Sequence, residues 1–142
     1  MAKGLAAGLP IGAVIAVPSL VDDIAIGDLG STFGGGPVVC AAALANIGVI
    51  EREDLMGNVR EVSARIVAEA SKLPHVVRVH GRGFLLGLEL DKPAAEVQNA
   101  LFGHRVLTGT STDPKTLRLL PPLSFADDEA TLLLKALRAV LA

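Results

Sequence analysis

The chain has 142 residues, enough for one ordinary domain, and 51% of them are hydrophobic, a share that excludes intrinsic disorder. The formal net charge is −2 and only 3% of the residues are aromatic, so the sequence offers neither a basic face nor a stacking platform for nucleic acid. The single cysteine, Cys40, excludes an internal disulfide and fits a reducing, cytoplasmic compartment, and the three histidines lack metal-ligand spacing.

The opening segment is apolar enough to raise the question of a membrane helix or a signal sequence. No charge occurs in residues 4–21, a length close to that of a membrane-spanning helix. Lys3 precedes this run, as a basic residue precedes the apolar part of a signal sequence. Pro10 and Pro18 divide the run, and a proline in a helix interior costs about 3 kcal/mol. The valine- and isoleucine-rich residues 11–17 between them therefore predict a buried strand, and we expect no membrane partner.

A glycine-rich loop follows at residues 27–36, and an alanine-rich helix is predicted from Pro37 to about Glu53. Because this helix is apolar on nearly all sides, we expect it to be buried. Asp54 is a good N-cap for a second helix that is predicted to run to Leu73.

From residue 76 onward the pattern changes to short strands and helices. Strands are predicted at 76–81, 83–90, 105–109 and 116–123, and helices at 94–103 and 127–141. This order favours an α+β unit in which helices cover one face of a small antiparallel sheet. We place a boundary between residues 53 and 54.

Three places along the chain could carry chemistry, and each has a plainer structural alternative. The amine of Lys3 could form a Schiff base with a carbonyl, or could be a solvated terminal charge. Ser31 and Thr32, in the glycine loop before a helix, could bind a phosphate, or could lie in a flexible connection. Arg118 leaves an apolar strand, so it needs a carboxylate from the protein or a substrate unless it reaches solvent.

Four segments in a fixed order carry a resemblance to a known family. They are AKGLAAGLPIGAVIA (2–16), GDLGSTFGGGPVVCAAALA (27–45), VHGRGFLLGLEL (79–90) and TLRLLPPL (116–123). In this order they resemble the Schiff-base segment, the phosphate loop with its helix, the VRGRG segment and the substrate-arginine strand of class III pyridoxal-phosphate-dependent aminotransferases. The acetylornithine aminotransferase group is the most similar.

The resemblance implies a role for each candidate residue. Lys3 would bind the aldehyde of pyridoxal 5′-phosphate (PLP) and then move the substrate proton. Ser31 and Thr32 would be cofactor-binding residues, with Thr32 reaching the phosphate across the interface of a dimer. Arg118 would hold the substrate α-carboxylate, and no residue would bind a metal.

The resemblance also implies the fold and the activity. The implied fold is α/β, more closely α+β: the C-terminal portion of a fold-type I PLP-dependent transferase. Residues 1–53 would be the remnant of the large PLP-binding domain, and residues 54–142 the small domain. The complete cytoplasmic enzyme, of arginine biosynthesis, would transfer an amino group between N-acetylornithine, or a related ω-amino acid, and 2-oxoglutarate.

The family's chains are much longer, and the part without a counterpart here would hold the main contacts to the cofactor ring. We therefore expect the isolated chain to be inactive. We expect it to pair with a second copy or with a complementary N-terminal part. The alternative is a truncated, non-enzymatic relative that acts as a folded interaction or dimerisation module.

Overall fold

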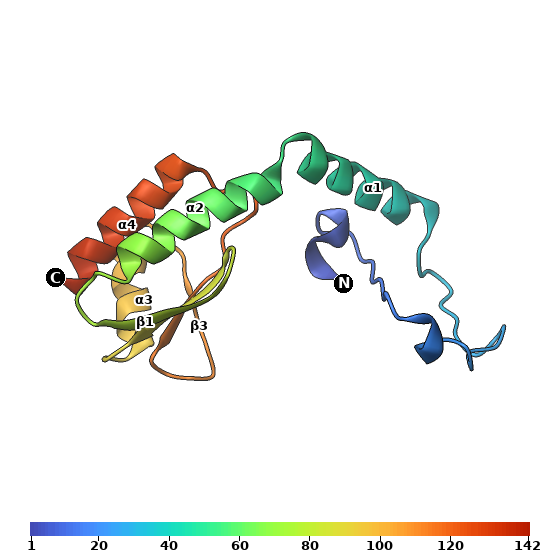
Figure 1. The fold of residues 1–142 in the computed structure, drawn as a ribbon, viewed down its shortest axis with the longest axis horizontal. Helices are drawn as coiled ribbons and strands as arrows, with labels where there is room; N and C mark the ends of the chain where they lie inside the picture. The colour runs from blue at the N-terminus through green and yellow to red at the C-terminus, as the bar shows by residue number, and fades with distance from the viewer. The chain divides into compact units, whose positions relative to one another are not determined.

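The structure is a computed structural model that describes residues 1–142 (Figure 1). The chain forms two compact units, Met1–Glu53 and Asp54–Ala142. The division falls where the sequence predicts a boundary. The assignment of the first unit to a larger PLP-binding domain stays a prediction.

The first unit is built on one α-helix. It contains the short 3-10 helices η1 (Lys3–Ala6) and η2 (Pro18–Leu20) and the α-helix α1 (Pro37–Arg52), whose bounds agree with the predicted helix. Pro37 occupies the first turn, where its missing N–H leaves no hydrogen bond unmade. Within this unit η1 packs beside α1, as Figure 1 shows in blue and teal.

The strand predicted at residues 11–17 does not form. The segment has no regular structure, and Val14 and Ile15 are 92% and 85% exposed. A strand needs a neighbouring strand to satisfy its backbone hydrogen bonds, and the first unit contains none. The prediction of a buried strand is therefore wrong for the chain as it stands.

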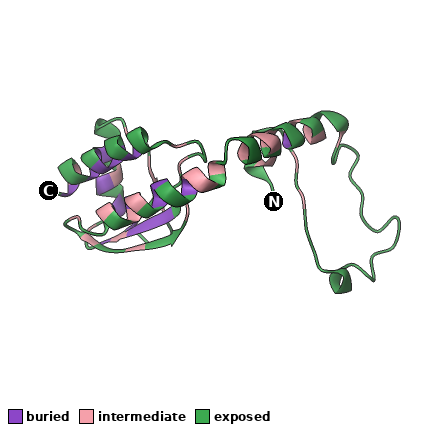
Figure 2. Cartoon of the chain, turned by 45° about the horizontal axis from the view of Figure 1, so that its top comes forward, coloured by how far each residue is buried: buried purple, intermediate pink, exposed green.

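The predicted burial of α1 is also wrong. Only Ala43 is buried, while Val38 and Leu44 on other sides of the helix are 74% and 71% exposed. In Figure 2 nearly all of the first unit is green or pink. The helix has the all-round apolar surface that the sequence predicts, but its own unit covers only part of it.

The second unit contains three helices and four strands. They are α2 (Leu55–Ala70), β1 (Val76–Arg82), β2 (Leu85–Leu90), α3 (Ala94–Gly103), β3 (Gly109–Thr110), β4 (Thr116–Leu119) and α4 (Asp127–Leu141). The α+β class and all three helices are as predicted, although α2 ends three residues before Leu73. No helix in the chain is both long enough and apolar enough to cross a bilayer.

The strand predicted at 105–109 is wrong except at its last residue, because β3 contains only Gly109 and Thr110. Arg105 has a φ of 61°, and the N–H of Val106 donates to the carbonyl of Leu101 at 3.0 Å. These two features continue the C-terminal cap of α3. The chain is therefore free to pair with a neighbouring strand only after residue 106.

The four strands form one antiparallel sheet in the order β1-β2-β4-β3. Alternation along β2 and β4 turns their leucines at 86, 88, 90, 117 and 119 toward the core. The helices α2, α3 and α4 contribute the other core residues, and Figure 1 shows these helices on one side of the sheet. The opposite face is open and carries Leu85, Arg118 and the ion pair of Arg78 with Glu89.

A charged network joins α2 to α4 on the surface of the second unit. Arg65 donates to Glu69 (Nε to Oε1, 2.9 Å) and to Thr131 (Nη2 to Oγ1, 2.8 Å), and it also pairs with Asp127. Arg138 donates to the second oxygen of Glu69. Hydrogen bonds from Arg65, and secondly from Arg138, hold the pKa of Glu69 below its ordinary value.

We expect the contribution of Glu69 to stability to depend on pH. A carboxyl whose pKa is lowered by folding stabilises the native state fully above about pH 5, and this contribution is lost as the pH falls through the lowered value. Urea unfolding should therefore show Glu69→Gln less stable than the wild type at pH 7, and the two equally stable near pH 3. Glu61→Gln, at an exposed position of α2 without an ion pair, is the matched control. A difference that persists unchanged at pH 3 would contradict the network's role.

Candidate active site

Lys3 opens η1 in an unusual backbone conformation. Its φ is 52°, in the left-handed region that costs a residue with a side chain about 1–2 kcal/mol. The side chain is exposed and makes no hydrogen bond or ion pair. Ala7, Asp54, His75 and Arg105 share this left-handed conformation, so it does not set Lys3 apart.

Asn46 fixes the segment that carries Lys3. Its Nδ2 donates to the carbonyls of Gly4 and Leu5 at 2.9 and 3.1 Å, and so ties η1 to α1. Ala6, at the end of η1, is only 1% exposed. Sequence reasoning missed Asn46, although the signal was present: it is the one polar side chain between Pro37 and Val49, in a helix that otherwise reads as apolar.

Ser31 lies in an open hollow of the first unit with a volume of about 890 Å³. One wall is the loop 29–35, and the other is the segment 10–14, which follows η1. The turn at Ser31 is tight: the N–H of Gly34 donates to the carbonyl of Ser31 at 3.3 Å. A Cβ at position 34 would lie 2.8 Å from Oγ of Ser31, so only glycine fits there.

The structure brings together some of the predicted residues of the first unit and not others. It sets Ser31 beside the segment 10–14. Neither Lys3 nor Thr32 lines this hollow, and Thr32 is exposed. The amine of Lys3 and the hydroxyl of Ser31 therefore do not share one cavity within this unit.

Arg118 lies on β4 in the second unit, with buried Leu117 and Leu119 on either side. No carboxylate of the protein holds the guanidinium, because Arg118 points to the open face of the sheet. It is exposed and makes no ion pair or side-chain hydrogen bond. The alternative given from the sequence, in which the guanidinium reaches solvent, describes Arg118 in this structure. All five of its N–H donors remain available.

The loop that leads into β4 is held by Asp113. Its carboxylate accepts from Oγ1 of Thr116 at 2.6 Å and from the N–H of Lys115 at 3.1 Å. The hydroxyl of Thr116, followed by the N–H of Lys115, lowers the pKa of the Asp113 carboxyl. Thr116 lies two residues before Arg118, so this turn sets the start of the strand that presents the guanidinium.

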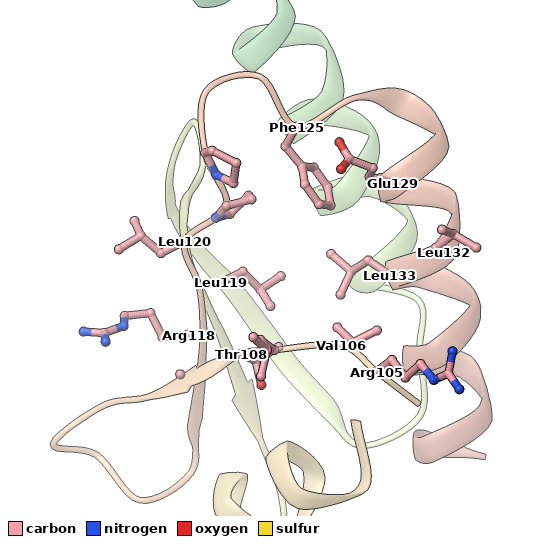
Figure 3. Close-up of a pocket in the computed structure, with 14 residues that line it drawn as sticks. Arg105, Val106, Thr108, Arg118, Leu119, Leu120, Phe125, Glu129, Leu132 and Leu133 are labelled. Atoms are coloured by element: carbon pink, nitrogen blue, oxygen red, sulfur yellow. The ribbon is translucent and has the colours of Figure 1, made fainter. Parts of the chain in front are cut away.

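A cavity of about 550 Å³ lies beside β4, between the sheet and α4. Figure 3 shows Leu119, Phe125 and Leu133 facing it, and Arg118 is also among the residues that line it. Its walls are mainly apolar, and the buried hydroxyl of Thr108 at its edge has no hydrogen-bond partner. The cavity is therefore mainly apolar, with the charged residues Arg105, Arg118 and Glu129 also in its lining.

Comparison with known proteins gives a consistent result over the whole chain. The family model "Aminotransferase class-III" matches residues 1–141. Acetylornithine aminotransferase 1 of Bordetella pertussis is 43% identical over 141 residues, which are 96% of this chain and 36% of that protein. Acetylornithine aminotransferase of Streptomyces coelicolor is 40% identical over 144 residues, again 36% of that protein.

Solved structures agree with the sequence comparison. Acetylornithine aminotransferase from Elizabethkingia anophelis matches with a TM-score of 0.78 at 26% identity, over 89% of this chain and 35% of that one. Ornithine aminotransferase from Toxoplasma gondii, whose active site holds PLP at partial occupancy, also gives 0.78 at 26% identity, over 87% of this chain and 30% of that one. The chain thus spans about a third of the length of the relatives that it matches.

Proposed function

The chain belongs to the class III aminotransferases, and from this premise we propose that it is the C-terminal third of a PLP-dependent enzyme. The proposed enzyme transfers an amino group between N-acetylornithine, or a related ω-amino acid, and 2-oxoglutarate. The observation that carries the proposal is the 43% identity to an acetylornithine aminotransferase over 96% of this chain. We place the activity in arginine biosynthesis and in the cytoplasm, the kind of reducing compartment in which an unpaired Cys40 is expected.

The donor groups of the first unit fit the cofactor. The primary amine of Lys3 suits the aldehyde, and the hydroxyls of Ser31 and Thr32 suit the phosphate. The tight glycine turn at Gly34 lets the backbone approach a ligand closely. Thr32 lies outside the hollow that contains Ser31, which is consistent with a contact to a cofactor bound in a second subunit.

Bound PLP would supply the electron-withdrawing ring that makes the substrate's amine-bearing carbon acidic. In this proposal Nζ of Lys3 would hold the cofactor aldehyde at rest, and would then accept and return the substrate proton. Asn46 keeps η1, and with it Lys3, in place. Arg118 binds the substrate α-carboxylate through the planar fork of its guanidinium, which stands free of any protein acceptor.

The proposal requires a partner for the first unit. Val14, Ile15, Leu29 and Phe33 are all at least 75% exposed, although residues of this kind are normally buried. We propose that a complementary N-terminal part and a second copy of the assembly cover this surface. The chain alone, mixed with PLP, should then give no transaminase turnover.

A second candidate function is a folded interaction module without activity. The second unit favours it, because its core is complete within residues 54–142. Size-exclusion chromatography, with and without a co-expressed N-terminal part, separates the two proposals. Binding to that part supports the enzyme assembly, self-association alone supports the module, and a monomer that ignores the part contradicts both.

A chimeric enzyme tests the proposed activity and the role of Arg118. Residues 1–142 would replace the matching segment of the Bordetella pertussis relative, and transamination of N-acetylornithine with 2-oxoglutarate would be measured. We expect activity, and we expect Arg118→Lys to raise KM by about 10- to 100-fold, the value of a charge-assisted hydrogen bond. Arg60→Lys, exposed on α2, is the control. A folded, PLP-binding chimera that transaminates no ω-amino acid would overturn the proposal.

A further inference from the structure

The open face of the sheet contains a glycine directly beneath the guanidinium of Arg118. In the antiparallel pair of β3 and β4, Gly109 is the residue opposite Arg118. A Cβ built on Gly109 would lie 3.1 Å from Nε of Arg118, 3.2 Å from Nη2 and 3.6 Å from Cζ. The guanidinium therefore occupies the space that a side chain at position 109 would fill.

This close approach explains why a glycine stands in a strand. Glycine is unfavourable in a strand by roughly 0.5–1 kcal/mol relative to alanine, and it often marks a place where another group comes near the backbone. The φ of Gly109 is not positive, so backbone conformation does not require glycine here. The requirement comes from the arginine that lies across it.

The same contact limits the directions in which Arg118 can point. No carboxylate or carbonyl of the protein holds the guanidinium, which packs over Gly109 of β3. A methyl group at 109 would make a contact tighter than normal, so Nε and Nη2 would have to move by a few tenths of an ångström. The two N–H groups that would face a carboxylate would move with them.

We propose that Gly109 is the positioning residue for the carboxylate-binding fork of Arg118. The proposal rests on the proposed role of Arg118 as the contact for the substrate α-carboxylate. It adds that the absence of a side chain at position 109 lets the guanidinium keep the orientation that favours that contact.

Nuclear magnetic resonance of the full 142-residue chain tests this proposal through the Nε–Hε signal of Arg118. Arg118→Lys, which lacks this group, assigns the signal. In the wild type we expect an ordered Nε–Hε bond, a nuclear Overhauser contact from Hε to the Hα protons of Gly109, and a shift on adding acetate but not chloride at equal ionic strength. In Gly109→Ala we expect the Nε–Hε bond of Arg118 to be less ordered, as for a side chain held off its rotamer. We also expect the acetate concentration that gives half of the shift to rise about threefold or more.

Gly103→Ala is the matched control, because a Cβ at that position meets no atom within 4 Å. The proposal would be overturned if the Nε–Hε bond of Arg118 were equally ordered, and the acetate midpoint equal, in Gly109→Ala and in the wild type. If Gly109→Ala fails to fold, the test is the nuclear Overhauser contact between Hε of Arg118 and Hα of Gly109 in the wild type. The absence of this contact would overturn the proposal. If acetate and chloride act alike on the wild type, the carboxylate role of Arg118 fails, while a loss of order in Gly109→Ala still supports positioning.

Discussion

Replacing Lys3 by alanine in the chimeric enzyme is expected to reduce transamination by about 10²–10⁴-fold, the usual contribution of a positioned general acid or base. The alanine variant can neither bind the cofactor aldehyde covalently nor move the substrate proton at Nζ. Single-turnover measurements with N-acetylornithine would give the rate of the chemical step. Lys3→Arg should fail in the same way, because arginine keeps the charge but is not deprotonated in proteins.

Two controls make the Lys3 result specific. Lys72→Ala removes another exposed lysine and should keep the wild-type rate. Added methylamine should restore part of the activity of Lys3→Ala, because a small amine can move the proton in place of Nζ. If Lys3→Ala keeps more than roughly a tenth of the rate, which is less than 1.4 kcal/mol of lost stabilisation, Lys3 is not the catalytic lysine.

Gly81→Ala is expected to destabilise the second unit by about 2–6 kcal/mol, from backbone strain together with steric overlap. The φ of Gly81 is 113°, a conformation that side chains rarely allow. A Cβ there would lie 2.0 Å from the carbonyl oxygen of Leu85 on β2, and that oxygen belongs to a backbone that cannot swing aside. The hairpin of β1 and β2 must then open or change register. Urea unfolding monitored by circular dichroism would measure the loss.

We expect alanine substitution to destabilise the second unit only at glycines where the added Cβ would overlap with another part of the fold. Gly83→Ala, whose Cβ would lie 2.9 Å from Cγ1 of Val59 on α2 at a φ of 54°, should also be unstable. Gly103→Ala, in open space at the end of α3, should unfold like the wild type or slightly later, because alanine favours helix. A Gly81→Ala chain as stable as the Gly103→Ala chain would show that the hairpin differs from the one described.

Much of the second unit could be predicted from the sequence because its signals are local. The apolar period of α2, its Asp54 cap and the acidic first turn of α4 depend only on residues close in the chain. The side chain of Asp54 does accept from the N–H of Gly57, at 3.1 Å. The first two strands were predicted as well, although β1 continues to Arg82, beyond the predicted end, and β2 begins at Leu85, two residues after the predicted start.

The amino-acid order is enough to identify the family, the order of helices and strands in the second unit, and the residue types proposed for chemistry. The three-dimensional arrangement was needed to find that residues 11–17 remain irregular, that Asn46 holds the Lys3 segment, and that Arg118 lies over Gly109 on the open face. The physical reason is the range of the interactions. Caps and periodicity act within a few residues, whereas strand pairing and the space above a backbone depend on groups far along the chain, whose positions no local pattern contains.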